Sequence, residues 1–462
     1  MPAATRYALL LLILAIAGFL RLYRLSTVPP GLYRDEAMDG SNALEVLETG
    51  RFQAFYPEDN GREGLYVNVA AVFVRFLGNE AWVLRLPAAI FGILTVWGVY
   101  LLAAELVSVP VGLLSAFFLA TSFWHVVLSR VAFRAIGGPL FLVWGVGLLM
   151  VALGRRRWGI AILAGAVYGL GFYTYIAYRA TPLVVAVVLL LAEKRIAARS
   201  AAAFGAAAAA VAAPLMVYFA GHPGAFWGRT SQVSVWRAPH PAWEIVLNLW
   251  RTGRMFFTRG DTNWRHNYAW RAEVFWPVAI LLVLGLLLAV RSRGRGMVAA
   301  WWLAAAALPV VLSGEQVPHA LRAILMAPAV FILAGIGGYG AYVWLAQRLP
   351  GKLVALVAGG ILLALCYEPY HTYFDRWAAD PHVPEFFDAR AAEIAGQIRA
   401  APPSAEKYVA VPPADPMAAQ PVMFLTGSYT PKERAETHIH YVLGPCREVV
   451  DSAPQGRVFC LP

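Results

Sequence analysis

Long apolar runs separated by short basic turns dominate the chain. A transmembrane helix needs about 20 consecutive apolar residues, and runs near this length recur along the sequence. The run 64–77 has only fourteen residues, roughly 21 Å of helix, so we predict that it lies in the membrane interface. The pattern indicates an all-α polytopic membrane protein. We predict about eleven spans, at residues 7–25, 86–106, 110–128, 139–153, 158–176, 180–192, 200–220, 273–290, 297–313, 320–344 and 352–368.

The basic residues of the short turns predict the orientation of these spans. Loops rich in Lys and Arg stay on the cytoplasmic side of a membrane. If the 64–77 helix does not span, four basic loops share one side, so we expect the N-terminus inside and the C-terminus outside. The formal net charge of +11 then reflects this orientation and not a nucleic-acid partner. The four loops are 154–158, 193–200, 291–296 and 347–352.

This topology divides the chain into a membrane domain, 1–368, and a small extracytoplasmic domain, 369–462. The outer face would also carry a first loop, 26–85, and a long loop, 221–272. We expect the C-terminal domain to be α/β, because a helical pattern precedes short strand-like runs. The helical pattern covers 386–400, and the strand-like runs are 408–411, 422–425, 439–443 and 457–461.

Two of the three cysteines lie in this tail, and whether they can pair depends on the compartment that the tail faces. Cys446 and Cys460 both lie in it, fourteen residues apart. An oxidising compartment would permit a disulfide between them. Two buried, unpaired thiols remain the alternative.

Charged residues gather where the outer ends of the spans meet the first loop. A single arginine at a membrane boundary usually extends to the headgroups. Several arginines together with carboxylates indicate an anionic ligand, and the planar guanidinium suits phosphate oxygens. A carboxylate among them is either a counter-ion or a general base for an acceptor hydroxyl, and spacing leaves both open. The gathered residues are Arg34, Asp35, Glu36, Asp39, Arg62, Glu63, Arg130, Arg134, Arg179, His319 and Arg322.

The stretches "RDEAMDGSNALEVLETGRF" and "NGREGLYVNVAAVFVRFLGNEAWVLRLPAAIFGILTVWGVYLLAAEL" resemble the amino-terminal half of glycosyltransferase family 39. This family of the GT-C superfamily groups protein O-mannosyltransferases and bacterial aminoarabinose transferases. The resemblance extends from residue 7 to about 190 and weakens beyond 200. It implies a GT-C-like membrane fold and inverting transfer of a sugar from a polyprenyl-phosphate donor. The transfer would take place on the extracytoplasmic face of a bacterial or archaeal-type cytoplasmic membrane.

The resemblance also implies roles for single residues. Asp35 of the Asp-Glu motif would be the catalytic base, and Glu36 would orient it. Glu63 stands where bacterial relatives have an acidic residue followed by Lys-Pro-Pro, but Gly64 and Leu65 follow it here. Relatives often have an aspartate after the third span, where this chain has Arg134 and no acid, so we do not expect a two-carboxylate metal site. We expect no required cofactor, with a divalent cation as the open alternative. The expected substrate-binding residues are Arg34, Arg62, Glu63, Arg130, Arg134, Arg179, His266, His319 and Arg322.

Several residues have a second interpretation. The stretch "RGDTNWRHNYAWR", 259–271, either contacts sugar faces or belongs to an interfacial aromatic belt. His266 and His319 are either metal ligands or hydrogen-bonding residues, and because neither has metal-ligand spacing around it, we expect them to form hydrogen bonds. Asp39 is expected to be solvated or to start a helix.

The partners follow from the predicted reaction. They are a polyprenyl-phosphate sugar donor, membrane lipids, and an acceptor that is a lipid, a glycan, a protein or a small molecule. The main alternative function is a multi-pass transporter or lipid flippase, which usually has ionisable groups near the bilayer midplane. The span interiors here contain almost no charge, and this favours an enzyme that works from one side.

Overall fold

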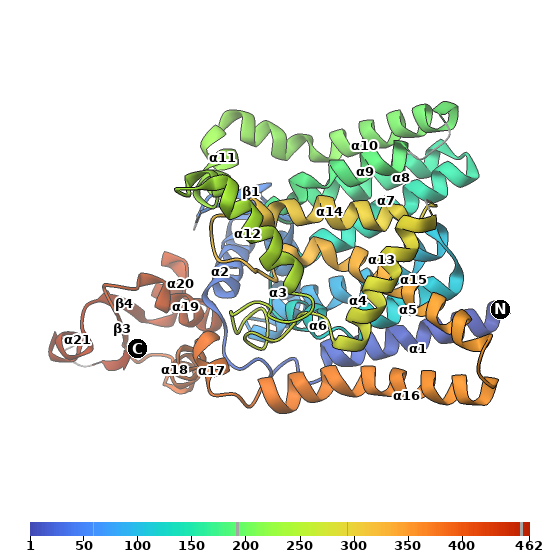
Figure 1. Ribbon diagram of the computed structural model, residues 1–462. Helices are drawn as coiled ribbons and strands as arrows, with labels where there is room; N and C mark the ends of the chain where they lie inside the picture. Colours follow the sequence, from blue (N-terminus) through green and yellow to red (C-terminus); the bar gives the residue numbers. More distant parts are fainter. Residues whose placement is uncertain (59, 191–193, 293, 453–455) are drawn as a thin grey trace.

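The computed structural model describes residues 1–58, 60–190, 194–292, 294–452 and 456–462. Parts of two predicted basic loops, 193–200 and 291–296, and the end of the predicted span 180–192 lie outside the described residues. The chain forms a bundle of long apolar helices, with a smaller region of helices and strands at one end (Figure 1). The bundle helices are α1 (Ala3–Leu22), α4 (Ala81–Leu106), α5 (Val109–Ala120), α6 (Phe123–Leu128), α7 (Gly137–Arg155), α8 (Trp158–Leu170), α9 (Pro182–Leu190), α10 (Lys194–Gly221), α13 (Trp276–Ser292), α14 (Met297–Val311), α15 (Ala327–Ala346) and α16 (Gly351–Tyr370).

The bundle helices confirm the prediction of an all-α, multi-pass membrane protein. Among the described residues, six helical segments are long and apolar enough to cross a membrane. The pair α13 and α14 passes the same test together and is bent by 118°. Shorter apolar helices lie at Leu65–Leu77, Val109–Ala120, Trp158–Tyr173 and Ile176–Leu190. Each predicted span therefore overlaps a helix, while the number of crossings stays a prediction.

The end of the bundle opposite the N-terminus carries the connecting elements (Figure 1). The first loop forms α2, a two-stranded antiparallel sheet and α3, which is the predicted interfacial helix. Short 3₁₀ helices begin several spans at this end. The elements are α2 (Arg34–Thr49), β1 (Phe55–Tyr56), β2 (Arg62–Glu63), α3 (Leu65–Leu77), η1 (Arg134–Ile136), η2 (Gly171–Tyr173), η3 (Ile176–Ala180), α11 (Pro223–Gln232), η4 (Val235–Arg237), α12 (Pro241–Arg254) and η5 (Arg322–Met326).

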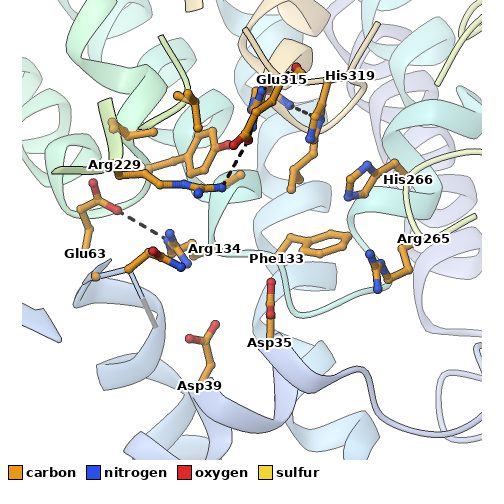
Figure 2. A pocket seen from close by; sticks show the side chains of 18 of the residues that line it. Asp35, Asp39, Glu63, Phe133, Arg134, Arg229, Arg265, His266, Glu315 and His319 are labelled. Carbon is orange, nitrogen blue, oxygen red and sulfur yellow. Dashed lines mark hydrogen bonds and ion pairs between the residues drawn. The ribbon is translucent and has the colours of Figure 1, made fainter. Parts of the chain in front are cut away.

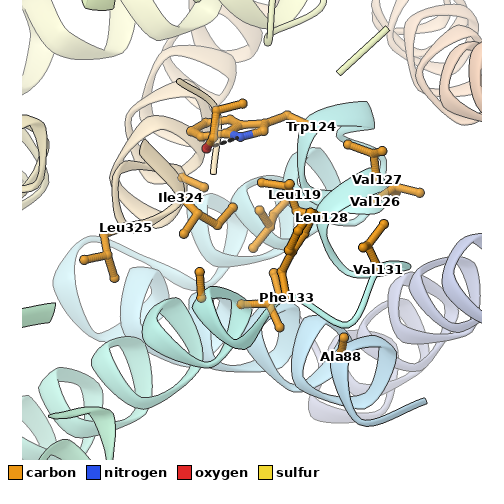
Figure 3. Close-up of a cluster of buried hydrophobic side chains, with 14 of the residues drawn as sticks. Ala88, Leu119, Trp124, Val126, Val127, Leu128, Val131, Phe133, Ile324 and Leu325 are labelled. Carbon is orange, nitrogen blue, oxygen red and sulfur yellow. Dashed lines mark hydrogen bonds between the residues drawn. The ribbon is translucent and has the colours of Figure 1, made fainter. Parts of the chain in front are cut away.

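A buried apolar cluster around Trp124 joins α6 to the loop that precedes η5 (Figure 3). Trp124 is fully buried, and Leu128, Ile324 and Leu325 are within 1% of full burial. The Trp124 indole N–H donates a hydrogen bond to the carbonyl of Ala320 at 3.0 Å. A buried indole needs such a partner, so this contact holds the backbone of the loop at the end of the bundle.

The tail forms a three-stranded parallel sheet in the order β4-β3-β5, with helices around it. Three of the four predicted strands are present, but 422–425 is part of a helix, so that prediction is wrong. Pro421 stands in the first turn of this helix, and Gly427 follows it in the left-handed region (φ 59°), which are typical helix boundaries. Cys446 and Cys460 form a disulfide, and Cys366 is free. The elements are η6 (His371–Trp377), α17 (His382–Phe386), α18 (Ala389–Ala400), β3 (Lys407–Val411), η7 (Pro416–Ala419), α19 (Gln420–Thr426), α20 (Pro431–Thr437), β4 (Ile439–Leu443), α21 (Cys446–Ser452) and β5 (Arg457–Cys460).

The tail packs directly on the first loop. A Cβ atom added to Gly40 of α2 would lie 2.5 Å from the Phe424 ring of α19. Gly31 has a φ of +71°, and a Cβ there would lie 2.3 Å from the carbonyl oxygen of Phe387. The Ser41 hydroxyl also donates to the Gln420 side-chain oxygen at 3.1 Å. Small residues before and within α2 therefore allow the tail to approach it closely.

Candidate functional site

A cavity of about 580 Å³ lies between α2, η1, η3, α11 and the loops before α13 and η5. Figure 2 shows Asp35 and Asp39 pointing from α2 toward it, with Glu63 and Arg134 on one side and His266 on the other. Arginines outnumber carboxylates in the lining, which favours an anionic ligand. The ionisable residues that line it are Asp35, Asp39, Glu63, Glu315, Arg134, Arg179, Arg229, Arg265, Arg322, His266 and His319, with Tyr33 and Tyr175 beside them.

Helical periodicity decides which acids of the Asp-Glu motif reach the cavity. Asp35 and Asp39 are four residues apart on α2, so their side chains share one face of the helix, and both line the cavity. Asp35 is half-buried, and it forms no hydrogen bond or ion pair with the described part of the chain. It is therefore a carboxylate that the fold leaves available to a ligand.

Glu36 faces the interior of the protein and does not line the cavity. Its two oxygens accept hydrogen bonds from the Nε and Nη2 atoms of Arg85, both at 2.9 Å. The backbone N–H groups of Tyr33 and Ala132 also donate to it, at 3.2 and 2.8 Å. With both charged groups almost fully buried, this pair fixes the start of α2 on α4. Sequence reasoning missed Arg85, which lies inside the apolar run "VLRLPAA".

Asp39 corrects one expectation, because its side chain is neither solvated nor at the start of the helix. It is 3% exposed and lies 3.5 Å from the Nε atom of Arg62. Burial raises the pKa of Asp39 to about 6, against the opposing effects of Arg62 and Arg134. Asp39 therefore holds a proton more readily than an ordinary aspartate.

Two carboxylates on opposite sides of the cavity organise the arginines. Glu63 lies 3.5 Å from the Nε atom of Arg134 and 3.7 Å from the Nη2 atom of Arg179. Glu315 lies 2.8 Å from the Nη2 atom of Arg322 and 3.8 Å from that of Arg229. Each carboxylate lies between two arginines, so each group of one carboxylate and two arginines keeps a net positive charge beside the cavity.

The fifth arginine of the cavity, Arg265, is arranged differently. Its guanidinium lies 3.9 Å from the centre of the Tyr33 ring, and within the described ranges no carboxylate forms an ion pair with it. Arg265 belongs to the stretch 259–271, which the sequence singled out as a whole. Arg229 of α11 and Glu315 were missed, because no recognisable motif surrounds them.

Three residues expected at the site lie away from this cavity. Arg130 is fully buried and donates to the carbonyls of Leu20 and Val28 at 3.0 and 2.8 Å. Arg62 is buried beside Asp39. Arg34 forms ion pairs with Asp388, at 3.1 Å, and with Asp415. Arg130 thus has a structural position, whereas Arg34 joins the first loop to the tail.

A second cavity, of about 530 Å³, lies on the tail side of the Asp-Glu motif. Asp35, Tyr33 and Arg265 line both cavities. The tail supplies most of the remaining wall. The lining residues not shared with the first cavity are Arg34, Glu385, Phe386, Asp388, Asp415 and Met417.

His266 and His319 lie together on the cavity wall, with Asp261 behind them. The Nδ1 atom of His266 is 3.0 Å from the Asp261 Oδ2 atom, as expected for a hydrogen-bonded histidine, and that of His319 is 3.8 Å away. Potential ligand atoms of the three residues lie within 4.8 Å of one another, so the group could hold a metal ion. Asp261 was missed, because His319 is distant from it in the sequence.

The stretch 259–271 reaches the cavity through Arg265 and His266. Its Trp264 stacks on His382 of the tail, with ring centres 4.8 Å apart, and its carbonyl accepts a hydrogen bond from the Trp377 indole at 3.0 Å. Trp264 therefore contacts the tail. Contact of this stretch with a sugar stays a prediction.

Comparison with known proteins shows which fold this chain shares with them. Residues 65–218, a third of the chain, match the family described as dolichyl-phosphate-mannose-protein mannosyltransferase. Two GT-C glycosyltransferases have similar solved structures. The chain has a GT-C fold. This confirms the resemblance seen in the sequence.

The two structures are ArnT from Cupriavidus metallidurans and the oligosaccharyltransferase AglB from Archaeoglobus fulgidus. The ArnT structure bound to undecaprenyl phosphate is 16% identical with a TM-score of 0.59, and the match covers 99% of this chain and 90% of ArnT. The AglB complex with an inhibitory peptide and a dolichol-phosphate is 13% identical with a TM-score of 0.59. That match covers 95% of this chain but only 64% of AglB. No curated protein sequence matches the chain significantly.

Proposed function

We propose that the chain transfers a sugar from a polyprenyl-phosphate-linked donor to an acceptor hydroxyl. The observation that carries this proposal is the position of Asp35, a carboxylate without an ion-pair partner in the described structure, in a cavity lined by five arginines. The GT-C fold supports it, since ArnT binds undecaprenyl phosphate and AglB binds a dolichol-phosphate in the matched structures.

The donor phosphate would bind between the two arginine pairs. Arg134 and Arg179 approach from the side of Glu63, and Arg229 and Arg322 from the side of Glu315. As the bond between the anomeric carbon and the phosphate oxygen breaks, its electrons pass to the phosphate. Fixed cations stabilise this growing negative charge, so departure of the phosphate needs no protonating acid.

Asp35 would remove the proton of the acceptor hydroxyl while the hydroxyl oxygen attacks the anomeric carbon. A single displacement from the face opposite the phosphate inverts the anomeric configuration. Glu36 would be a positioning residue, because its buried ion pair with Arg85 holds α2 so that Asp35 faces the cavity. The two acids of the motif would therefore have separate tasks.

The acceptor would enter from the second cavity. This cavity meets the first at Asp35, so a hydroxyl placed there faces the base while the donor lies beyond it. The tail provides Glu385, Asp388 and Met417 to its wall, and the tail would therefore select the acceptor. The predicted orientation places both cavities on the extracytoplasmic face.

The test is transfer by the purified protein. Radiolabelled polyprenyl-phosphate sugars would be offered with membrane extract, and the labelled product identified. General-base catalysis contributes about 10²–10⁴-fold, so Asp35→Asn should slow transfer by at least about 100-fold. Glu48→Gln, a change at an exposed carboxylate on the same helix, is the matched control and should keep the wild-type rate.

Thermal unfolding in detergent would accompany the rate measurement. Asp35→Asn should unfold near the wild-type temperature, because Asp35 forms no ion pair in the described structure. A folded Asp35→Asn protein that transfers sugar at the wild-type rate would refute the role of Asp35. Absence of transfer from every polyprenyl-phosphate sugar by the wild type would refute the function.

A further inference from the structure

The helix α12 carries its apolar side chains on the side that faces away from the protein. Four apolar residues on one side of the helix are each 55–65% exposed. On the opposite side, Asn248 and Thr252 are each only 2% exposed. A helix on the surface of a soluble protein has the reverse arrangement, with its apolar residues toward the core. The exposed residues, called the α12 stripe below, are Trp243, Val246, Leu249 and Trp250.

The polar side of α12 is fixed on the end of α14. The side-chain amide of Asn248 donates hydrogen bonds to the carbonyl oxygens of Val311, at 3.2 Å, and Ser313, at 2.7 Å. Loss of these bonds would leave a buried amide without partners, which costs free energy. A rotation of α12 that turned the stripe toward the protein is therefore unfavourable, and the stripe stays on the outside.

Two more exposed tryptophans lie just before α12. Trp227 of α11 is 62% exposed, and Trp236 of η4 is 68% exposed. Together with Trp243 and Trp250 of the stripe, they concentrate four exposed indole rings in residues 227–250. Tryptophan is enriched where a membrane meets water, because its ring is apolar while its N–H can reach polar groups. This composition is typical of a surface at the membrane interface.

The stripe also borders apolar residues that a bundle helix exposes. Leu308 and Leu312, at the end of α14 that Asn248 contacts, are 37% and 40% exposed. The pair α13 and α14 is together long and apolar enough to cross a membrane. Figure 1 shows α12 running obliquely across the end of α14 and not along it. With α14 in the membrane, α12 would therefore lie along the membrane surface, as amphipathic interfacial helices do.

The charge of this segment suits anionic lipid headgroups. Residues 223–259 contain five arginines and a single carboxylate, Glu244. Two of these arginines, Arg237 and Arg259, are exposed. Helices with tryptophan and leucine on one face and arginine beside it bind membranes that contain anionic lipids. Charge complementarity therefore favours a phospholipid leaflet as the partner of the stripe.

We propose that the α12 stripe, with Trp227 and Trp236, inserts into the interface of a phospholipid leaflet that contains anionic lipids. The membrane then anchors the middle of the long loop 221–272. Asn248 holds the segment that leads to Glu315 of the first cavity, so the anchored helix supports one side of that cavity. This inference does not depend on the proposed function.

The test measures whether the stripe lies in the bilayer. The full chain with Cys366→Ser would carry a spin label at Val246→Cys and be reconstituted into vesicles of phosphatidylethanolamine and phosphatidylglycerol. Labelling without reductant keeps the disulfide between Cys446 and Cys460. Oxygen concentrates in the bilayer, whereas a water-soluble nickel chelate stays outside it. The collision rate with oxygen, relative to that with the chelate, should be several-fold higher at Val246→Cys than at Glu436→Cys, a control at an exposed residue of α20.

Three results would overturn the proposal. Equal ratios at the two positions would place the stripe in water. Exclusion of both reagents from the label at Val246→Cys would show that protein covers the stripe. Spectral broadening by a second label nearby would show that a second copy of the chain covers it. If Val246→Cys does not fold, Leu249→Cys in the same stripe replaces it. Because no sugar transfer is measured, failure here is distinct from failure of the proposed function.

Discussion

Asp39 and Asp35 lie on one face of α2, but their surroundings differ. Asp35 is half-buried and available to a ligand, whereas Asp39 is enclosed beside Arg62. Loss of solvation disfavours the ionised form of Asp39 more than the nearby arginines favour it. The two aspartates have similar neighbours in the sequence. Their different burial, and not their spacing, therefore gives them different chemical properties.

The raised pKa of Asp39 predicts a pH-dependent stability difference. In the unfolded chain the carboxyl loses its proton near pH 3.8, and in the folded chain near pH 6. The folded state thus holds an extra proton in this window, so stability falls as the pH rises through it. Asp39→Asn cannot ionise and should escape this loss, which is roughly 3 kcal/mol.

The measurement is the unfolding temperature in detergent from about pH 4 to about pH 7, for the wild type and Asp39→Asn. The difference between the two should change in favour of Asp39→Asn as the pH rises. Groups other than Asp39 titrate in both proteins and cancel in this difference. If the difference between the two unfolding temperatures stayed constant across this pH range, the raised pKa of Asp39 would be contradicted.

At the scale of elements, α2 connects three parts of the molecule. One face supplies Asp35 to the cavities, Glu36 ties the helix to α4, and Gly40 lies against Phe424 of α19. The tail therefore docks on the helix that carries the proposed base. Changes to this contact should alter the second cavity before they alter the bundle.

Gly40→Ala should loosen the tail. The added methyl group would lie 2.5 Å from the Phe424 ring and 2.8 Å from a methyl group of Leu84 in α4, so both α19 and the Leu84 side chain must shift. We expect faster proteolytic release of the tail, and Phe424→Ala should partly restore resistance in the double variant by removing the clash. Gly396→Ala, where a Cβ would meet no atom within 4 Å, is the control. Equal proteolysis rates for Gly40→Ala and Gly396→Ala would show that the contact does not hold the tail.

At the scale of the whole molecule, the chain has two unlike ends. The N-terminus and the turn between α15 and α16 lie at one end, and α2, α11 and the tail lie at the other (Figure 1). The basic loops predict that the first end is cytoplasmic. Both cavities lie at the second end.

Cysteine labelling tests this orientation. Cys366 is the free cysteine of the chain, so Cys366→Ser provides a background without a reactive thiol. In that background Glu48→Cys should react with an impermeant maleimide in intact cells. Arg155→Cys should react only after permeabilisation, because the loop 154–158 is predicted to be cytoplasmic. The reverse pattern would invert the topology and remove the extracytoplasmic placement of the cavities.

The sequence predicted the apolar helices well, because each bundle helix carries its own signal of length and hydropathy. It also singled out Asp35, Glu63, Arg134, Arg179 and Arg322, which line one cavity, while their roles stay predictions. It could not separate Arg130 from these, since a buried and a ligand-facing arginine look alike in a one-dimensional pattern. The helix at 422–425 was misjudged because four apolar residues fit either structure.

Local properties of the chain are what the sequence by itself determined: the apolar helices, the likeness to GT-C enzymes and the Asp-Glu motif at the start of α2. Tertiary structure alone decided which charged groups meet. The Glu36 to Arg85 pair joins residues 49 positions apart, and Asp261 meets Ala320 across 59 positions. The physical reason is that burial and charge pairing depend on distances in space, which chain packing sets and no local pattern encodes.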